Sequence, residues 1–138
     1  MAVFDDISKA LKGIMLDNDF SLPVIYENAF DEAQPIGTAF LAIFQLPAQP
    51  TQATLGDAGC DLHTGIFQID INYPSGEGMA LLVQKADEIN AVIKSGATFT
   101  NNGLNVRINN VGISRLVVSD GLATINMTIE YNSFSTRV

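Results

Sequence analysis

Two segments in which apolar and polar residues alternate constrain the fold of this chain most strongly. Between Ile66 and Tyr73, an apolar set (Phe67, Ile69, Ile71, Tyr73) alternates with a polar set (Gln68, Asp70, Asn72). Between Leu122 and Tyr131, isoleucine, methionine and tyrosine alternate in the same way with asparagine, threonine and glutamate. A two-residue period is that of a β-strand with one buried and one wet face. The chain therefore needs a second layer that covers the apolar face of a sheet.

Two amphipathic stretches can supply that layer. Residues 4–17 carry apolar side chains at three- and four-residue steps, which predicts a helix with the stripe Phe4, Ile7, Leu11, Ile14 and Met15. A second helix is expected after Ser75-Gly-Glu-Gly78, where Ser75 reads as its N-cap, with the apolar stripe Leu82, Ala86, Ile89 and Ile93. Gly96 is well placed just past its end.

The remaining apolar runs predict further strands at residues 22–26 and 39–46, and at residues 104–108 and 113–118, which form either one strand or two segments bent at Gly112. Asn102-Gly103 and Asp120-Gly121 are strong hairpin signals. We expect an α/β (α+β) fold in which two helices pack on one face of a mainly antiparallel, four- to five-stranded sheet with an extended β-hairpin arm. The length of 138 residues fits a single domain over residues 1–138.

The expected arm is the segment 47–64, which lies between two strand signals. As a plain loop it would exceed the length of about 12–15 residues beyond which loops are usually functional or disordered. A hairpin that extends past the sheet, with its tip near Gly56, explains it better. Leu55 and Leu62 would then be exposed to water unless a partner covered them, which indicates assembly.

The charge is unevenly distributed. The chain has 15 acidic and 7 basic side chains and a net charge of −8, and residues 1–70 hold ten of the acids and two of the bases. Acids that keep a small protein soluble are one explanation, and a negative surface that meets a basic partner is another. Arg107 and Arg115, on expected strands, could clamp an anion or form surface or interface salt bridges with an acidic neighbour.

Composition also excludes several classes of protein. A net charge of −8 lacks the basic surface that binds duplex DNA. The N-terminus lacks the basic and then apolar layout of a secretory signal, so we expect neither export nor membrane insertion. A single cysteine, Cys60, agrees with folding in a reducing cytoplasm.

Catalysis would have to use Cys60, His63 or paired carboxylates. Strand alternation places Cys60 and His63 on opposite faces, so we do not expect a Cys–His nucleophile. A metal site built from Asp57, Cys60, Asp61 and His63 lacks the second ligand pair that a structural zinc site usually has. The chain has no G-x-S-x-G, P-loop or G-x-G-x-x-G motif. We therefore expect a protein that is not an enzyme.

The order of these elements, together with two short sequence motifs, resembles that of the tail terminator proteins of long-tailed phages and prophages. The resemblance covers nearly the whole chain. Its most specific parts are Gln52-Ala-Thr-Leu-Gly-Asp57 and Gly65-Ile-Phe-Gln-Ile-Asp70.

This resemblance implies a structural virion protein that forms a homo-hexameric ring. The ring would cap the tail tube, end its polymerisation and offer a surface for head joining. Its implied partners are copies of itself, the tail tube protein and a head-completion or connector protein, with DNA only passing through the lumen. The implied location is the host cytoplasm during assembly and then the virion tail. Together with the residue-level reasoning, the expected interface residues are Gln52, Thr54, Leu55, Gly56, Asp57, Leu62, Arg107 and Arg115.

No cofactor is expected, although a divalent ion that assists ring formation is left open. Two alternatives to the ring protein remain. One is a small protein-binding module that uses the 47–64 arm, and the other is a metal-dependent enzyme built on Asp57, Cys60, Asp61 and His63.

Overall fold

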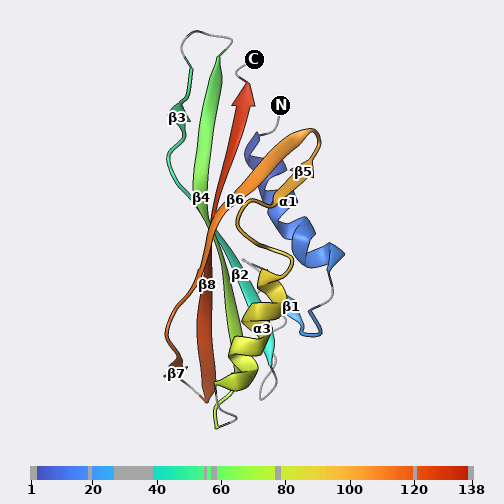
Figure 1. Cartoon of the computed structure of the whole chain (residues 1–138), viewed down its shortest axis with the longest axis vertical. Helices are drawn as coiled ribbons and strands as arrows, with labels where there is room; N and C mark the ends of the chain where they lie inside the picture. Colours follow the sequence, from blue (N-terminus) through green and yellow to red (C-terminus); the bar gives the residue numbers. More distant parts are fainter. Residues whose placement is uncertain are drawn as a thin grey trace.

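The structure is a computed structural model that describes residues 3–18, 20–26, 39–54, 56, 59–76, 79–119 and 121–136. These residues form two helices and eight strands (Figure 1). In chain order the elements are α1 (Val3–Asp17), β1 (Val24–Ile25), β2 (Phe40–Pro47), β3 (Thr51–Gln52), β4 (Cys60–Pro74), α3 (Ala80–Asn90), β5 (Thr98–Asn101), β6 (Leu104–Ile113), β7 (Val117–Ser119) and β8 (Leu122–Thr136).

The strands β4 and β8 run through the whole length of the sheet. Each has 15 residues, and they pair antiparallel from Cys60 opposite Thr136 to Pro74 opposite Leu122. The strand order is β1-β2-β4-β8-β6-β5, while β3 pairs with β4 and β7 pairs with β8. All pairs are antiparallel except β1 with β2, which is parallel.

The prediction of an α/β (α+β) fold with a mainly antiparallel sheet of four to five strands is wrong. The fold is mostly sheet, and the sheet has eight strands, is mixed because of the parallel β1–β2 pair, and curls into a half-barrel. Four of the strands (β1, β3, β5 and β7) have only two to four residues. The predicted strands at residues 22–26 and 113–118 overlap β1 and β7, whereas β3 and β5 are too short to show an alternation of their own.

The helix expected at residues 4–17 is present as α1, but the second helix differs from its prediction. It runs from Ala80 to Asn90, and its N-cap, Met79, makes no side-chain capping hydrogen bond. The prediction that Ser75 caps this helix is therefore wrong. The backbone N–H of Ser75 instead donates to the carbonyl oxygen of Gly121 at 2.9 Å, which joins the end of β4 to the start of β8.

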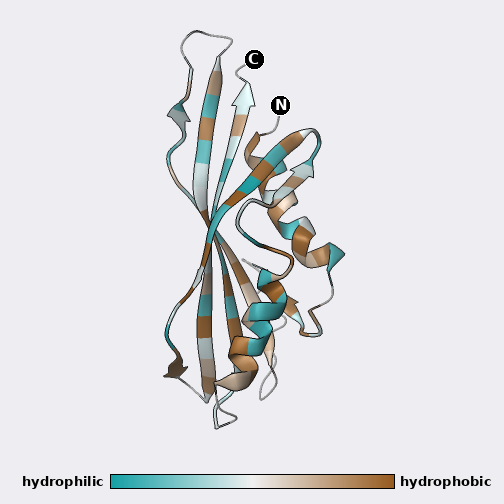
Figure 2. Cartoon of the chain, in the orientation of Figure 1, coloured by the Kyte–Doolittle hydropathy of each residue, from teal (hydrophilic) through white to brown (hydrophobic). Residues whose placement is uncertain are grey.

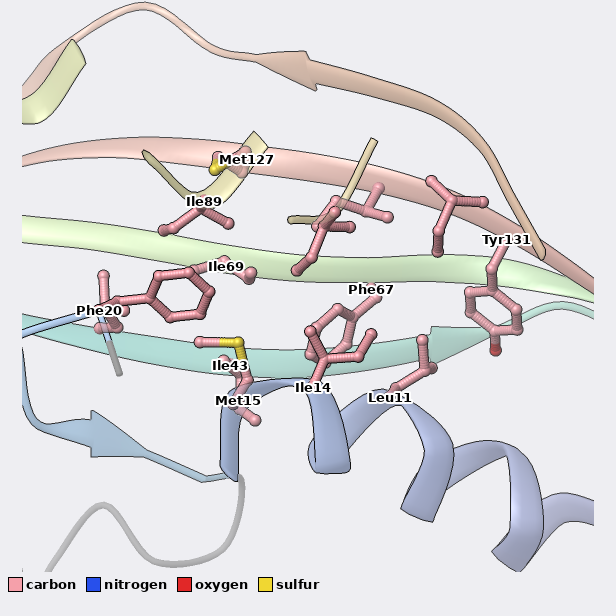
Figure 3. Close-up of a cluster of buried hydrophobic side chains, with 14 of the residues drawn as sticks. Leu11, Ile14, Met15, Phe20, Ile43, Phe67, Ile69, Ile89, Met127 and Tyr131 are labelled. Atoms are coloured by element: carbon pink, nitrogen blue, oxygen red, sulfur yellow. The ribbon is translucent and has the colours of Figure 1, made fainter. Parts of the chain in front are cut away.

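One face of the sheet, the inner face, shares a single hydrophobic core with both helices (Figure 3). Strands β4 and β8 contribute side chains of the apolar phase of their alternation: Phe67, Ile69, Ile71, Ile125, Met127 and Ile129. The helices cover them with Leu11, Ile14 and Met15 from α1 and Leu82, Ala86 and Ile89 from α3. The alternating segments therefore bury the faces that the sequence predicts.

The opposite, outer face of the sheet is more polar. In Figure 2, hydrophilic residues (teal) and hydrophobic residues (brown) alternate along β4 and β8. Along β4 it presents Gln68, Asp70 and Asn72, which lie opposite Thr128, Asn126 and Thr124 of β8. A second, small apolar cluster lies on the side of β2, where Ile25, Phe40 and Ala42 pack with Phe44 and Leu122.

The sheet extends at one end into a three-stranded projection, at the top of Figure 1. We call residues 47–64 together with residues 132–136 the arm. Here β4 begins at Cys60, well before the Ile66 that the sequence suggests, and it pairs on one side with β8 and on the other with β3. The predicted hairpin therefore gains a third strand, the end of β8.

Candidate interaction surfaces

The arm is joined to the core through His63, which lies on the inner face and is 7% exposed. Its Nε2 lies 2.9 Å from Oγ of Ser135 on β8, and its ring packs edge-on against Phe4 of α1, with 5.5 Å between the ring centres. Cys60 lies three residues earlier on β4 and so points to the outer face. The arrangement holds a strand in place and provides no Cys–His pair for catalysis.

Gly65 is the first residue of the second sequence motif, Gly65–Asp70, and it lies where the arm meets the core. It lies directly opposite Tyr131 of β8. The Tyr131 side chain is buried, and its hydroxyl accepts a hydrogen bond from Nε2 of Gln45 at 3.3 Å. Burial raises the pKa of Tyr131, and the bond from Gln45 opposes that shift. Gly65 thus provides the space that the ring fills.

The last residue of the same motif, Asp70, lies half-buried on the outer face. Its Oδ1 accepts a hydrogen bond of 2.8 Å from Nε2 of Gln68. Burial raises the pKa of the Asp70 carboxyl, and the bond from Gln68 opposes the shift. Phe67 and Ile69 lie between these residues and point into the core. The motif therefore contains a glycine that leaves room for the Tyr131 side chain, two core residues and one hydrogen-bonded polar pair.

Most of the predicted interface residues lie on the arm. Gln52 is exposed on β3 opposite Asp61, and the hydroxyl of the exposed Thr54 accepts a hydrogen bond of 2.6 Å from the backbone N–H of Cys60. Gly56 is exposed and has a positive φ of 93°. Leu62 lies on the outer face, opposite Phe134. Leu55 and Asp57 lie outside the described residues.

The two predicted arginines lie elsewhere and apart from each other. Arg107 is exposed on β6, opposite Asn132 of β8, and Arg115 is exposed in the segment that joins β6 to β7. The structure therefore does not bring Arg107 and Arg115 together into one anion clamp.

Sequence reasoning missed the most exposed aromatic side chain of the arm, Phe134. It is 58% exposed on the outer face of β8, beyond the expected strand end at Tyr131. On the same face, Leu46 is 51% exposed opposite Ile66. The available signal was an aromatic residue in the polar phase of an alternating strand, between Asn132 and Thr136.

A second exposed apolar surface lies along the edge of the sheet beside α3. Strand β5 pairs only with residues 104–107 of β6, and the rest of β6 and all of β7 pair with β8 on one side. On their other side, no strand of the described residues lies next to them. Ile113, Val117 and Val118 are 50%, 51% and 61% exposed there, and β7 is among the strongly apolar segments in Figure 2. We call residues 109–119 the open edge.

Beside the open edge, a groove of about 260 Å³ separates α3 from β6. It is lined by Val83, Ala86, Asp87, Asn90, Val111, Gly112, Ile113 and Met127. A second hollow, of about 350 Å³, lies between α1 and β5 and has a more polar lining that includes Lys9, Asp17, Thr98 and Asn101. Near it, the buried Asp6 accepts a hydrogen bond of 3.2 Å from Nδ2 of Asn101, while its other carboxylate oxygen has no hydrogen-bond partner among the described residues.

The described part of the chain has neither a cluster of metal ligands nor a helix that could span a membrane. No three His, Cys, Asp or Glu side chains gather there in a way that could hold a metal ion, although Asp57 of the predicted metal set is not described. Neither helix is long and apolar enough to cross a membrane.

Comparison with known proteins places this geometry in a family. The chain matches the family model described as phage tail terminator protein over residues 6–131. No curated protein matches the chain. One solved structure without a descriptive name is 22% identical, with a TM-score of 0.73 and 92% of each chain covered. A chain in the virion of a native gene transfer agent particle is 12% identical, with a TM-score of 0.62 and 97% of this chain and 98% of that chain covered. Both likenesses show that the fold is shared, and the family match shows that the chain belongs to the phage tail terminator proteins, which gives it a structural role in the tail.

Proposed function

We propose that this chain forms a homo-hexameric ring that caps the tail tube, ends its polymerisation and presents a surface for head joining. Family membership supports the role in the tail. The observation that carries the ring is the outer face of the arm, where Phe134 is 58% exposed beside Leu62, and where Leu46, directly before the arm on the same face, is 51% exposed. Exposed apolar surface of this kind marks a protein–protein contact site.

The proposed ring contacts the tail tube protein on one side and a head-completion or connector protein on the other, with DNA passing through its lumen. Assembly takes place in the host cytoplasm, and the ring then stays in the virion tail. A chain of the same fold in a gene transfer agent virion supports a place in such a particle. The charge of −8 on each subunit gives the ring a negative field that keeps passing DNA from adhering.

No catalytic step is part of this proposal. The two most reactive side chains of the arm, Cys60 and His63, point to opposite faces, and the imidazole is buried against Ser135 and Phe4. A divalent ion could still strengthen the ring by reducing the repulsion between acidic subunits, so it is treated as a variable of the experiment.

Light scattering coupled to size-exclusion chromatography, from micromolar to millimolar protein, tests the ring. We expect the mass to rise to that of six subunits, and we expect magnesium to lower, or EDTA to raise, the concentration needed if a divalent ion assists. A mass that stays at one or two subunits throughout would contradict the proposal and favour a small binding module that uses the 47–64 arm.

A further inference from the structure

Two exposed apolar surfaces of this chain lie at different levels of the long β4–β8 pair and on different faces of the sheet. The first is on the outer face of the arm, where Phe134 lies beside Leu62. The second is the groove between α3 and β6, with Ile113 at its open edge and Met127 in its lining. Each surface leaves apolar area in water when the subunit is alone.

The two surfaces cannot meet within one subunit. Phe134 and Met127 are seven residues apart on the same strand, which at about 3.3 Å per residue separates them by about 23 Å. Their side chains also point to opposite faces, because Met127 is part of the inner core and Phe134 lies on the outer face. If the surfaces cover each other, they do so between copies.

The charges of the two segments are complementary. Residues 47–64 of the arm contain Asp57 and Asp61 and no lysine or arginine. The open edge, residues 109–119, contains Arg115 and no acid. Arg115 is exposed and forms no salt bridge within the described residues. Asp87 also lines the groove, so the positive charge lies on its sheet side and not on its helix side.

The groove has room for an aromatic ring. Its volume is about 260 Å³, and a cavity of about 150 Å³ already holds a benzene molecule. Val83, Ala86, Val111 and Met127 give it apolar walls. An aromatic side chain that fills such a pocket is the usual anchor of a protein–protein contact.

From these observations we propose that Phe134 of one copy seats in the α3–β6 groove of the next copy, with the acidic arm lying along the open edge near Arg115. This inference deepens the proposed function, on which it rests, by naming the contact between subunits. The contact joins two different surfaces, so it repeats head to tail, and head-to-tail contacts give a closed ring when the rotation closes.

The experiment uses the full chain and three variants, each studied alone and in mixtures. Phe134→Ser removes the anchor, and Ile113→Asp places a charge at the edge of the groove; both positions are at least half exposed, so the fold is retained. Leu16→Ser is the matched control, because Leu16 is 73% exposed on α1 and belongs to neither surface. Circular dichroism confirms that each variant is folded, and sedimentation velocity measures its association.

We expect Phe134→Ser and Ile113→Asp each to weaken association by at least about tenfold, while Leu16→Ser has no effect. An equal mixture of the first two variants is expected to form dimers and no larger species. Each dimer would use the intact Phe134 of the Ile113→Asp chain and the intact groove of the Phe134→Ser chain.

The outcomes separate this inference from the function beneath it. If the unaltered chain associates and the two variants associate equally well, the Phe134 contact is refuted and the ring stands. If both variants are monomers and their mixture also stays monomeric, the head-to-tail pairing is refuted. If the unaltered chain never associates, both the ring and the contact fail.

Discussion

A β-carbon placed on Gly65 would lie 2.5 Å from Oη of Tyr131 and 2.8 Å from the carbonyl oxygen of Leu46. No β-carbon fits at these distances, so Gly65 and Tyr131 fill one volume between them. Tyr131 is 2% exposed, and Gln45 fixes its hydroxyl from β2. The pair therefore joins β2, β4 and β8 where the arm leaves the core.

Gly65→Ala is expected to destabilise the fold, because both nearest atoms of the new methyl group belong to a buried ring and to backbone. Overpacking of this kind costs about 1–3 kcal/mol in the free energy of unfolding, which urea titration measures. Gly65→Ala combined with Tyr131→Phe should recover part of the loss, since the hydroxyl is the closest of the atoms met. Equal stability of Gly65→Ala and the unaltered chain would contradict this account of the junction.

The same substitution at Gly13 should have the opposite effect. Gly13 lies inside α1, and nothing lies within 4 Å of a β-carbon built on it. Glycine in a helix interior is about 0.5–1 kcal/mol less favourable than alanine. We expect Gly13→Ala to raise the free energy of unfolding by that amount in the same urea titration, and a loss of stability would show that α1 is packed differently.

Asp70→Asn should stabilise the fold near neutral pH. Burial raises the pKa of Asp70 above its ordinary value of 3.8, so the ionised carboxylate is less favourable in the folded chain than in the unfolded one. The amide oxygen of asparagine can still accept the hydrogen bond from Gln68. The gain should shrink as the pH falls through the raised pKa and vanish below 3.8, because the unaltered chain then becomes neutral by protonation. Thermal unfolding across this pH range measures it, and a gain independent of pH would refute the cause.

His63→Leu should loosen the arm more than the rest of the fold. It leaves the buried hydroxyl of Ser135 without its 2.9 Å partner, which costs about 1–3 kcal/mol. Hydrogen exchange should become faster in residues 60–64 and 132–136, while the exchange of Ile69 and Ile125 changes less. His63→Gln is the matched variant, because its amide can reach Ser135, and it should retain most of the protection. Uniform loss of protection in both variants would contradict a local role.

Cys60→Ser is expected to leave tail assembly intact, which electron microscopy of assembled tails measures. Cys60 lies on the face opposite His63, and its backbone N–H, which the substitution keeps, donates to the hydroxyl of Thr54. If Cys60 were a nucleophile or a metal ligand, its replacement by serine would abolish the activity that depends on it. Loss of assembly in a folded Cys60→Ser chain would revive the metal-dependent alternative.

Long periodic segments of this fold could be predicted because one face of each is buried in the core and the other face is exposed to water. The three-and-four spacing of α1 and the alternation around Ile69 and Met127 follow directly from which side chains the core accepts. The Asn102-Gly103 hairpin could also be predicted, since both residues adopt the positive φ that this turn requires, 52° and 82°.

The number of strands and the start of β4 could not be predicted from the same patterns. The β1–β2 pair is parallel, so it depends on tertiary contacts that no local signal encodes. On the inner face, residues 60–64 present only Asp61 and His63, which are both polar. His63 is buried only because Ser135 and Phe4 meet it from distant parts of the chain. A strand stabilised in this way shows no hydrophobic period.

The interface predictions stay partly open for a similar reason. Gln52, Thr54, Gly56 and Leu62 could be assigned to a projecting arm from its length and composition. Phe134 and the α3–β6 groove could not be predicted, because exposure is set by how far β8 continues and by where β5 ends.

The length of tails made without this protein tests the central claim most directly. Electron microscopy of particles from a phage or prophage in which the gene is deleted gives the distribution of tail lengths, and expression of the unaltered chain in trans provides the control. We expect tails of uncontrolled length, not joined to heads, with normal lengths restored by the control. Tails of normal length in the deletion strain would contradict the proposal that this chain ends tail polymerisation.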